Sequence, residues 1–354
     1  MTSSLRIAVV SSARSIHTIR WVEWLKGHGH EVALFSLVEG DGATHFGPEP
    51  PLDRRYLFTL GSAVRRTTGR LRRMLDDFAP QVVHGFNLVN HGNYAVRAGH
   101  HPVVVTALGS DVLLAPDESW LLSRIVHKTA LRADRVIAPP VLVENLRKWK
   151  IDEKRLLSLI FGVDCDLFKP GRKELLVLFS RGFRDVYDPL CLARAIPEVI
   201  REVPEARFIL AGNGPLREEV AEMLEDASPN VSLPGLLPEN ELANLMGRAR
   251  AVVTPALSDS IPLTALEAMA SGAVLVASDI KANHQWASTS APVLLFPPGD
   301  ADALAKALVR ALTEEGLSQQ ALEQGPPLVD ANWRWDEAAA TVEALYHELC
   351  SSRA

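Results

Sequence analysis

Two carboxylates stand on either side of a proline, and their spacing suits a site that grips one ligand at two points. Asp259 and Glu267 are eight residues apart, just after an apolar run. Pro262 fits the first turn of a helix, where its missing N–H costs nothing. The backbone N–H groups of Leu263 and Thr264, together with the helix dipole, would then favour a diphosphate. The structural alternative is that Asp259 caps the helix and Glu267 is a solvated surface residue.

Short β-branched runs alternate with longer amphipathic stretches along the chain. Near-continuous apolar runs such as LRIAVV and ELLVLF suit strands that are covered on both faces of a sheet. The stretches between them carry helical spacing, as in Ile196, Val199 and Val203. This alternation predicts parallel sheets with right-handed crossovers. The expected strands are residues 6–12, 31–36, 81–84, 103–107, 135–138, 156–160, 175–180, 207–211, 231–233, 251–254, 274–278 and 293–296.

Twelve strands would overfill one open sheet, so we expect an α/β protein with two doubly wound, Rossmann-like domains. The first domain is expected at 1–165 and the second at 174–334, joined by the polar, proline-bearing linker 166–173. In paired domains of this kind, ligands lie beyond the carboxyl ends of the strands. The loops that follow the strands are therefore the places where functional residues are expected.

The composition is that of an ordinary globular protein and excludes several functional classes. The chain has 354 residues, and its net charge of −6 gives no reason to expect a nucleic-acid partner. Its three cysteines are widely separated and form no ligand spacing, which fits a reducing compartment better than a disulfide framework. We find neither a signal-peptide pattern nor a stretch of membrane-spanning length, so a cytoplasmic protein is expected.

The segment from Asp259 to Gly272 resembles the signature of glycosyltransferase family 4, retaining nucleotide-sugar transferases of the GT-B fold. In that signature an acidic residue is followed, after seven positions, by Glu and then Ala-Met-Ala-x-Gly, as here at Glu267. Further similarity lies in HTIRWVEWLKGHGHEVALFS, GSDVL, FGVDCDLFKP and ARFILAGNGPLREEV, so it covers nearly the whole chain. The resemblance implies two Rossmann-like domains facing a cleft, an acceptor-binding first domain and a donor-binding second domain. It also implies a last helix, about 335–354, that packs back on the first domain.

The resemblance gives roles to residues of the second domain. The family Glu that matches Glu267 binds ribose hydroxyl groups, and the acid that matches Asp259 contacts a hydroxyl of the donor sugar. The N–H groups that match Leu263 and Thr264 hold the diphosphate. Arg181 matches a diphosphate-binding arginine, and its guanidinium would neutralise the charge that grows on the leaving phosphates.

Two positions depart from the family pattern. A Lys that usually follows Arg181 by six residues is Tyr187 here, and Arg184 from the same loop is the candidate to supply that charge. A His that many relatives place before Gly-Ser-Asp is Leu108, which cannot hydrogen-bond, so that contact is lost or made by another residue. These departures keep open a catalytically weakened GT-B partner or binding protein. A sugar-nucleotide epimerase on the same scaffold is a further alternative.

Loops of the first domain supply the remaining cleft residues that the resemblance implies. Arg14, Ser15 and His17 follow the first expected strand, where the family approaches the acceptor and the donor diphosphate. His17 could equally be a solvent-facing residue at a helix start. Asp111 is either a cap at a helix start or a wall of the pocket, and the pocket is favoured.

The implied reaction uses no cofactor and no metal ion, because the nucleotide sugar is itself the substrate. A UDP-sugar is the favoured donor, and the acceptor hydroxyl, lipid-linked, polysaccharide or natural-product, is unknown. The acceptor attacks beside the departing diphosphate, which takes the proton, so catalysis rests on positioning and charge stabilisation. Gly214 would border the nucleotide base, and the run around Leu237 would meet it through the backbone. Asp164-Cys165-Asp166 spells a metal-binding motif of another glycosyltransferase fold, but it lies near the expected linker and we expect no metal there.

An arginine-rich stretch without acids runs from residue 54 to residue 73. Five of its members are expected on one helix: Arg65, Arg66, Arg70, Arg72 and Arg73. The simple interpretation is a solvated helix face. The functional alternative is peripheral contact with an anionic membrane or a phosphorylated lipid acceptor, where each basic residue contributes about 1 kcal/mol.

Overall fold

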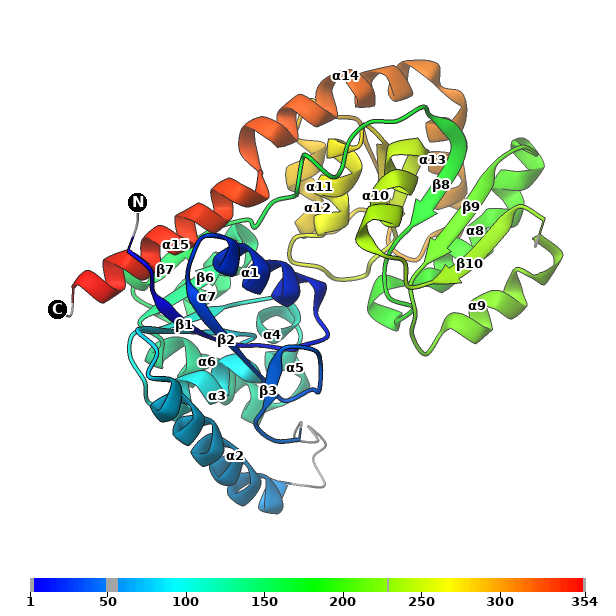
Figure 1. The fold of residues 1–354 in the computed structure, drawn as a ribbon. Coiled ribbons are helices and arrows are strands. Elements are labelled where there is room, and N and C mark those ends of the chain that lie inside the picture. Colours follow the sequence, from blue (N-terminus) through cyan, green and yellow to red (C-terminus); the bar gives the residue numbers. More distant parts are fainter. Residues whose placement is uncertain (1–2, 49–56, 228, 353–354) are drawn as a thin grey trace. The chain divides into compact units, whose positions relative to one another are not determined.

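A computed structural model describes residues 3–48, 57–227 and 229–352. The chain forms two compact units, each built on a parallel sheet (Figure 1). The first unit holds the chain up to Ile160 and from Ala339 onward, and the second holds residues 161–338. The predicted α/β class with two parallel sheets is therefore confirmed.

Within the described residues, seven strands form the sheet of the first unit in the order β3-β2-β1-β4-β5-β6-β7, and neighbouring strands are parallel. They are β1 (Arg6–Val10), β2 (Glu31–Ser36), β3 (Ala43–His45), β4 (Val82–Phe86), β5 (Val103–Thr106), β6 (Arg135–Ala138) and β7 (Leu156–Ser158). The sequence analysis missed β3, because this short edge strand buries none of its side chains. The other strands follow the apolar runs.

Helices cover both faces of this sheet. On one face lie α2 (Leu57–Phe78), α3 (His91–Ala98), α6 (Trp120–Arg132) and α7 (Pro140–Lys148), which share one hydrophobic cluster with the strands. On the other face lie α1 (Ile16–Gly27) and α15 (Trp335–Ser351), whose Trp21 and Tyr346 pack against His84 of β4. The loops carry α4 (Ser110–Leu113), α5 (Ala115–Glu118) and the 3-10 turn η2 (Glu153–Arg155). Among the described residues, no helix has the length and apolar character of a membrane span.

In the described part of the second unit, six strands form a parallel sheet in the order β10-β9-β8-β11-β12-β13. Its strands are β8 (Glu174–Phe179), β9 (Arg207–Ala211), β10 (Val231–Gly235), β11 (Ala249–Thr254), β12 (Val274–Ser278) and β13 (Val293–Phe296). Its helices are α8 (Pro189–Glu202), α9 (Arg217–Met223), α10 (Glu239–Arg248), α11 (Leu263–Ala270), α12 (Lys281–Ala287), α13 (Ala301–Thr313) and α14 (Glu315–Asn332), with 3-10 turns η3 (Asp185–Tyr187) and η4 (Glu225–Ala227).

The strand order reverses once in each sheet, and these reversals matter for ligand binding. In the second unit the chain builds β8, β9 and β10 in one direction, and then returns to add β11 on the other side of β8. The same reversal lies between β1 and β4 in the first unit. Loops that leave the carboxyl ends of two such strands diverge, which opens a crevice between them. The residues after β8 and β11 therefore flank a natural ligand site.

The C-terminal helix α15 begins in the second unit and continues into the first. Within the first unit, Glu343 accepts a hydrogen bond from the His30 imidazole at 3.1 Å. The Tyr346 hydroxyl lies 2.5 Å from Nδ1 of His84, and Glu348 pairs with an arginine of β6 at 2.9 Å. These contacts hold residues 339–352 on the first sheet.

The segment that the sequence analysis treated as a linker packs on the second unit. The boundary between the two units falls after Ile160, and Val163 forms an isolated parallel bridge with Arg334. Lys173 donates hydrogen bonds to the carbonyl oxygens of Gly247 at 2.9 Å and Ser271 at 2.7 Å. These acceptors lie at the ends of α10 and α11, where a cation is favourable. Polar composition alone did not reveal this docking.

Candidate active site

An ion pair lies at the strand-order reversal of the second unit. Arg181 follows β8 and Asp259 follows β11, and these two strands are neighbours. A guanidinium Nη atom of Arg181 lies 2.5 Å from Oδ2 of Asp259, and the two side chains are only 15% and 12% exposed. The structure therefore brings together two of the residues that the sequence analysis placed at the phosphates and the sugar. It also joins them to each other, which the sequence did not indicate.

Two glycines and an aromatic ring pack closely against the loop that carries Arg181. A Cβ atom on Gly212 would lie 2.2 Å from the carbonyl oxygen of Arg181, and one on Gly214 would lie 2.3 Å from that of Phe183. Any side chain at these positions would displace the loop. The guanidinium carbon of Arg181 lies 4.2 Å from the ring centroid of Tyr187, which is a cation–π distance. Tyr187, the departure from the family lysine, thus supports Arg181 directly.

The start of α11 is built from backbone, not from a capping side chain. Pro262 is the residue before the first helical turn, and no side chain caps the helix there. Ala265 N–H donates to the Pro262 carbonyl at 2.9 Å, and the N–H groups of Leu263 and Thr264 precede it in the first turn, where the helix offers no intrahelical acceptors. The alternative that Asp259 caps this helix is wrong, because its carboxylate bonds Arg181 and the Ser260 N–H.

Glu267 is not a residue of an ordinary solvated helix face. Six of the eight residues of α11 are buried, and the two that keep some exposure are Leu263 and Glu267. These two residues are four positions apart and share one side of the helix. The exposed surface of α11 is therefore one narrow stripe. Glu267 lies on this stripe, one turn after the helix start where the donor phosphates are expected.

The small residues after Glu267 have a packing role. Gly272 has φ +65°, and a Cβ there would lie 2.9 Å from a Leu322 methyl group of α14. From the other side, a Cβ on Gly325 would lie 2.5 Å from the Met269 carbonyl oxygen. The Ala-Met-Ala-Ser-Gly stretch lets α11 lie directly against α14, which fixes the direction of the helix and of Glu267.

The remaining second-unit candidates lie on loops at the same edge of the sheet. Arg184 is exposed and begins η3, three residues beyond Arg181. Gly214 and Leu237 follow β9 and β10, and these two loops are tied by a 2.7 Å hydrogen bond from Gly212 N–H to the Gly235 carbonyl. Leu237 is half-buried. The glycine at position 214 is explained by its close approach to Phe183, whether or not a base lies beside it.

In the first unit, the loop after β1 is ordered by contacts with the loop after β2. Ala13 N–H donates to the Ser36 hydroxyl at 3.0 Å, and Nε of Arg14 lies 3.3 Å from the Glu39 carbonyl. Ser15 is the N-cap residue of α1, although its side chain makes no capping bond. His17 is exposed in the first turn of α1. All three sequence candidates therefore lie at the carboxyl end of β1, beside the strand-order reversal.

Asp111 holds two loops together. It is 1% exposed, and its carboxylate accepts N–H bonds from Leu88 at 2.8 Å, Gly109 at 2.8 Å and Leu108 at 3.1 Å. Burial raises the pKa of this carboxyl, and the backbone N–H groups oppose that shift. These bonds clamp the loop after β4 to the loop after β5. The role of Asp111 as a pocket wall stays a prediction. The neighbouring Leu108 side chain is 49% exposed.

The Asp164-Cys165-Asp166 motif has a structural explanation. In this motif, Oδ1 of Asp164 accepts hydrogen bonds from the N–H groups of Asp166 at 2.9 Å and Leu167 at 3.1 Å, which forms a turn.

The sequence analysis missed a group of three side chains, His30, Glu343 and His347, whose ligand atoms lie within 4.8 Å of one another. Nδ1 of His30 accepts the Leu5 N–H, so the imidazole proton is on Nε2 and is donated to Glu343. We interpret this group as a hydrogen-bonded clamp on α15.

The arginines of α2 are all exposed, but they differ in the groups that they contact. Arg72 donates to the carbonyl oxygens of Ala98 at 2.7 Å and Arg97 at 3.3 Å, at the end of α3. The exposed members of the set are Arg65, Arg66, Arg70, Arg72 and Arg73. Residues 54 and 55, which open the arginine-rich stretch, lie outside the described residues.

Two family models match the chain, one in each unit. The model described as "Glycosyl transferase 4-like" matches residues 6–139, and the model described as "Glycosyl transferases group 1" matches residues 174–314. The second match contains Arg181, Asp259 and Glu267. Together the two matches span most of both units.

Relatives and solved structures agree with these matches. The chain is 23% identical to a phosphatidyl-myo-inositol mannosyltransferase of Mycolicibacterium smegmatis, over 94% of this chain and 89% of the relative. It is 26% identical to a sulfoquinovosyl transferase of Arabidopsis thaliana, over 80% and 60%. The fold is similar to sucrose-phosphate synthase from Thermosynechococcus elongatus, with a TM-score of 0.79, 19% identity and coverage of 98% and 100%. It is also similar to Anabaena HepE in complex with UDP-glucose, with a TM-score of 0.76, 13% identity and coverage of 98% and 100%. The chain belongs to the group 1, family-4-like glycosyltransferases of the GT-B fold, and is a sugar-transferring enzyme of the hexosyltransferase type.

Proposed function

We propose that this glycosyltransferase binds its nucleotide-sugar donor at the β8–β11 reversal and transfers the sugar with retention of its anomeric configuration. The observation that carries the proposal is the Arg181–Asp259 pair, which lies in the loops beside the start of α11. A cation and an uncapped helix start suit a diphosphate, and a carboxylate suits a sugar hydroxyl.

Each part of the donor has a partner in this arrangement. Arg181 and the N–H groups of Leu263 and Thr264 would hold the diphosphate. Asp259 would accept a hydrogen bond from a hydroxyl of the sugar. Glu267 would accept hydrogen bonds from the ribose hydroxyl groups, on the far side of the phosphates. The roles of Gly214 and Leu237 near the base, and of Arg184 as a second cation, follow the same placement.

The proposed reaction needs no protein base. The acceptor oxygen forms a bond to the anomeric carbon on the face from which the diphosphate leaves, and the bond from that carbon to the phosphate oxygen breaks. The acceptor proton passes to the departing phosphate. Arg181 and the helix start stabilise the charge that develops there, so catalysis rests on preorganised electrostatics.

A UDP-sugar is the donor we favour. The fold is shared with Anabaena HepE, whose structures contain UDP and UDP-glucose. A GDP-mannose-dependent mannosyltransferase of Mycobacterium tuberculosis is 25% identical over 51% of the chain and 52% of that relative, which makes GDP-mannose the donor to compare. The acceptor side of the reaction is assigned to the first unit, with Arg14, Ser15 and His17 as its candidates.

Calorimetry with UDP-, GDP-, ADP- and dTDP-sugars tests the proposal. We expect binding of at least one donor, slow hydrolysis or transfer in its presence, and product with the anomeric configuration of the donor. Absence of binding across the panel would remove the donor site. Binding without turnover over a broad acceptor set would favour a catalytically weakened partner instead.

We also propose that the exposed arginines of α2 make peripheral contact with an anionic membrane. Arg66, Arg70 and Arg73 share one exposed stripe of this helix, and Trp120 at the start of α6 is 74% exposed. Exposed arginines and tryptophan suit the interface of a bilayer. Flotation with anionic liposomes tests this contact, and flotation that is unchanged when the three arginines are replaced by Gln would exclude it.

A further inference from the structure

A positively charged groove runs between α2, α3 and α6 on the outer side of the first unit. It consists of two adjoining cavities of about 300 Å³ and 150 Å³, which share Arg97 of α3 and Arg132 of α6 in their walls. Helix α3 packs between α2 and α6 on the same face of the sheet (Figure 1). We call this feature the α2–α3–α6 groove.

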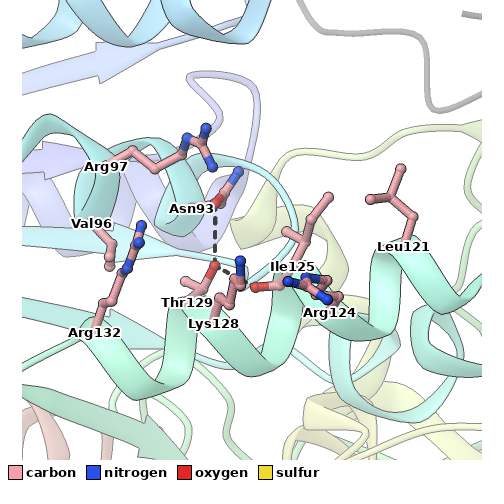
Figure 2. A pocket seen from close by; sticks show the side chains of 9 residues that line it. All are labelled: Asn93, Val96, Arg97, Leu121, Arg124, Ile125, Lys128, Thr129 and Arg132. Carbon is pink, nitrogen blue, oxygen red and sulfur yellow. Dashed lines mark hydrogen bonds between the residues drawn. The ribbon is translucent and has the colours of Figure 1, made fainter. Parts of the chain in front are cut away.

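The groove is lined by cations from all three helices. Figure 2 shows Arg97 and Arg132 at one side of the smaller cavity, with two further cations along α6. The cationic lining residues of the whole groove are Arg65, Arg72, Arg97, Arg124, Lys128 and Arg132. Among the lining residues that the structure describes, none is acidic. Charges of one sign gathered in a concave surface repel each other and raise the local concentration of anions.

A buried hydroxyl group in the larger cavity lacks a partner. Thr68 is nine-tenths buried, and among the described residues its hydroxyl oxygen has no hydrogen-bonding partner. Thr68 lines the cavity together with Arg65 and Arg72. A buried hydroxyl without a partner costs free energy, so the site gains from a ligand that accepts a hydrogen bond. This requirement separates the groove from an arginine face that only meets water.

The groove is also shaped and preorganised. A Cβ atom on Gly69 would meet nothing within 4 Å, so this glycine of α2 leaves the floor of the cavity open. Arg72 is held by its bonds to the carbonyl oxygens at the end of α3. In the smaller cavity, the Thr129 hydroxyl lies 3.4 Å from Oδ1 of Asn93, so the amide nitrogen of Asn93 is turned away from Thr129 (Figure 2). Fixed donors in a concave site bind an anion at lower entropic cost than mobile surface arginines do.

We propose that the α2–α3–α6 groove is a binding site for a phosphate-bearing ligand, separate from the donor site on the second unit. Guanidinium groups bind phosphate oxygens with two parallel hydrogen bonds, and the Thr68 hydroxyl adds a neutral donor. The phosphate can come from a soluble phosphomonoester or from the headgroup of a membrane lipid. The same recognition chemistry serves both sources.

The experiment uses the full-length protein with two probes that carry the same phosphomonoester. Glycerol 3-phosphate is titrated by calorimetry, and phosphatidylcholine vesicles with and without phosphatidic acid are used in flotation. The groove variants are Thr68→Val, Gly69→Glu and the double variant Arg97→Gln/Arg132→Gln. The matched control is Lys148→Gln/Lys150→Gln, which removes the same charge from exposed residues of the first unit outside the groove. An Arg181→Gln variant separates this site from the donor site.

The expected result is loss of phosphate binding in the groove variants only. Arg97→Gln/Arg132→Gln should weaken binding about tenfold or more, the effect of losing charge-assisted hydrogen bonds, and Thr68→Val about threefold. Gly69→Glu, which places a carboxylate in the open cavity, should abolish binding while circular dichroism shows the native fold.

The two probes distinguish the sources. Groove-dependent binding of glycerol 3-phosphate identifies a soluble ligand, and groove-dependent binding of phosphatidic acid vesicles alone identifies a lipid headgroup. Equal losses in the groove variants and in Lys148→Gln/Lys150→Gln would overturn the proposal, because they indicate diffuse surface charge. Binding that responds to Arg181→Gln and to no groove variant would also overturn it, because the anion would then occupy the donor site.

Discussion

The Arg181–Asp259 pair makes a prediction whose sign is unusual. If Arg181 binds the donor diphosphate, Asp259 competes with that diphosphate for the same guanidinium. Replacement of Asp259 by Asn keeps the size of the side chain and one acceptor oxygen but removes the negative charge. We therefore expect Asp259→Asn to bind a nucleoside diphosphate as tightly as the native enzyme, or more tightly, and to transfer sugar far more slowly.

The magnitude follows from the geometry of the pair. The nitrogen and oxygen atoms are 2.5 Å apart and the side chains are largely buried. Charge centres about 4 Å apart attract each other by about 4 kcal/mol at an effective dielectric of 20, before desolvation is counted. If only a quarter of this, about 1 kcal/mol, opposes the diphosphate, the substitution would raise nucleoside diphosphate affinity about fivefold. Arg181→Gln should act in the opposite direction and weaken the affinity about 10- to 100-fold, as expected when charged hydrogen bonds are lost.

Calorimetry with the nucleoside diphosphate of the best donor, followed by transfer kinetics, measures both effects. Asp185→Asn is the matched control, because Asp185 is an exposed acid of η3 in the same region. It changes the net charge equally without touching Arg181. If Asp259→Asn weakened nucleoside diphosphate binding as much as Arg181→Gln does, the competition argument would be refuted and the pair would be a structural unit of the loop.

Three further predictions concern Glu267, Gly214 and two buried histidines. Glu267→Ala should weaken nucleotide binding about tenfold through lost ribose contacts, and this difference between the two proteins should shrink with the 2′-deoxynucleotide; an undiminished difference would contradict the ribose role. Gly214→Ala, whose new Cβ would lie 2.3 Å from the Phe183 carbonyl oxygen, should raise the KM for the donor through displacement of the Arg181 loop, while circular dichroism stays native. Burial lowers the pKa of His84 to about 3 and that of His91 to about 4. Unfolded histidines take up protons below about pH 6.5, whereas these buried histidines stay neutral until the pH reaches their lower pKa. Each histidine should therefore lower the free energy of unfolding by about 1.4 kcal/mol per pH unit between about pH 6.5 and its pKa in the folded protein. Urea unfolding of the enzyme at pH 7 and pH 5 measures this, and a flat profile would contradict it.

The sequence predicted the fold well because its signal is local. Buried parallel strands are short apolar runs, and these runs located every strand except β3, which buries no side chain. The interdomain segment was harder to place. Its polar residues predicted a linker but not where it docks: Lys173 donates to the carbonyl oxygens of Gly247 and Ser271, which are distant in sequence. Such docking depends on the tertiary fold and leaves no periodic trace.

The candidate site was predictable residue by residue but not in its pairings. Arg181 and Asp259 are 78 positions apart, and only the strand order makes β8 and β11 neighbours. The sequence analysis singled out Asp111, but the orientation of its carboxylate toward the N–H groups of Leu88 and Gly109 depends on the three-dimensional path of the loop after β4. The sequence analysis missed the α2–α3–α6 groove for the same reason, because the cations of the groove come from three helices. The sequence grouped the arginines of α2 as one patch, whereas the structure divides them between the groove and an open stripe.

The ion pair also bears on how the enzyme would distinguish donor from product. Arg181 and Asp259 form an ion pair with each other. A complete sugar nucleotide would replace both halves of the pair, because its diphosphate takes Arg181 and its sugar hydroxyl takes Asp259. A nucleoside diphosphate without the sugar takes Arg181 and leaves Asp259 a mostly buried carboxylate with no cation, which is costly. On the proposed function, the pair therefore favours donor over spent nucleotide, and Asp259→Asn should reduce that preference as well as the rate of transfer.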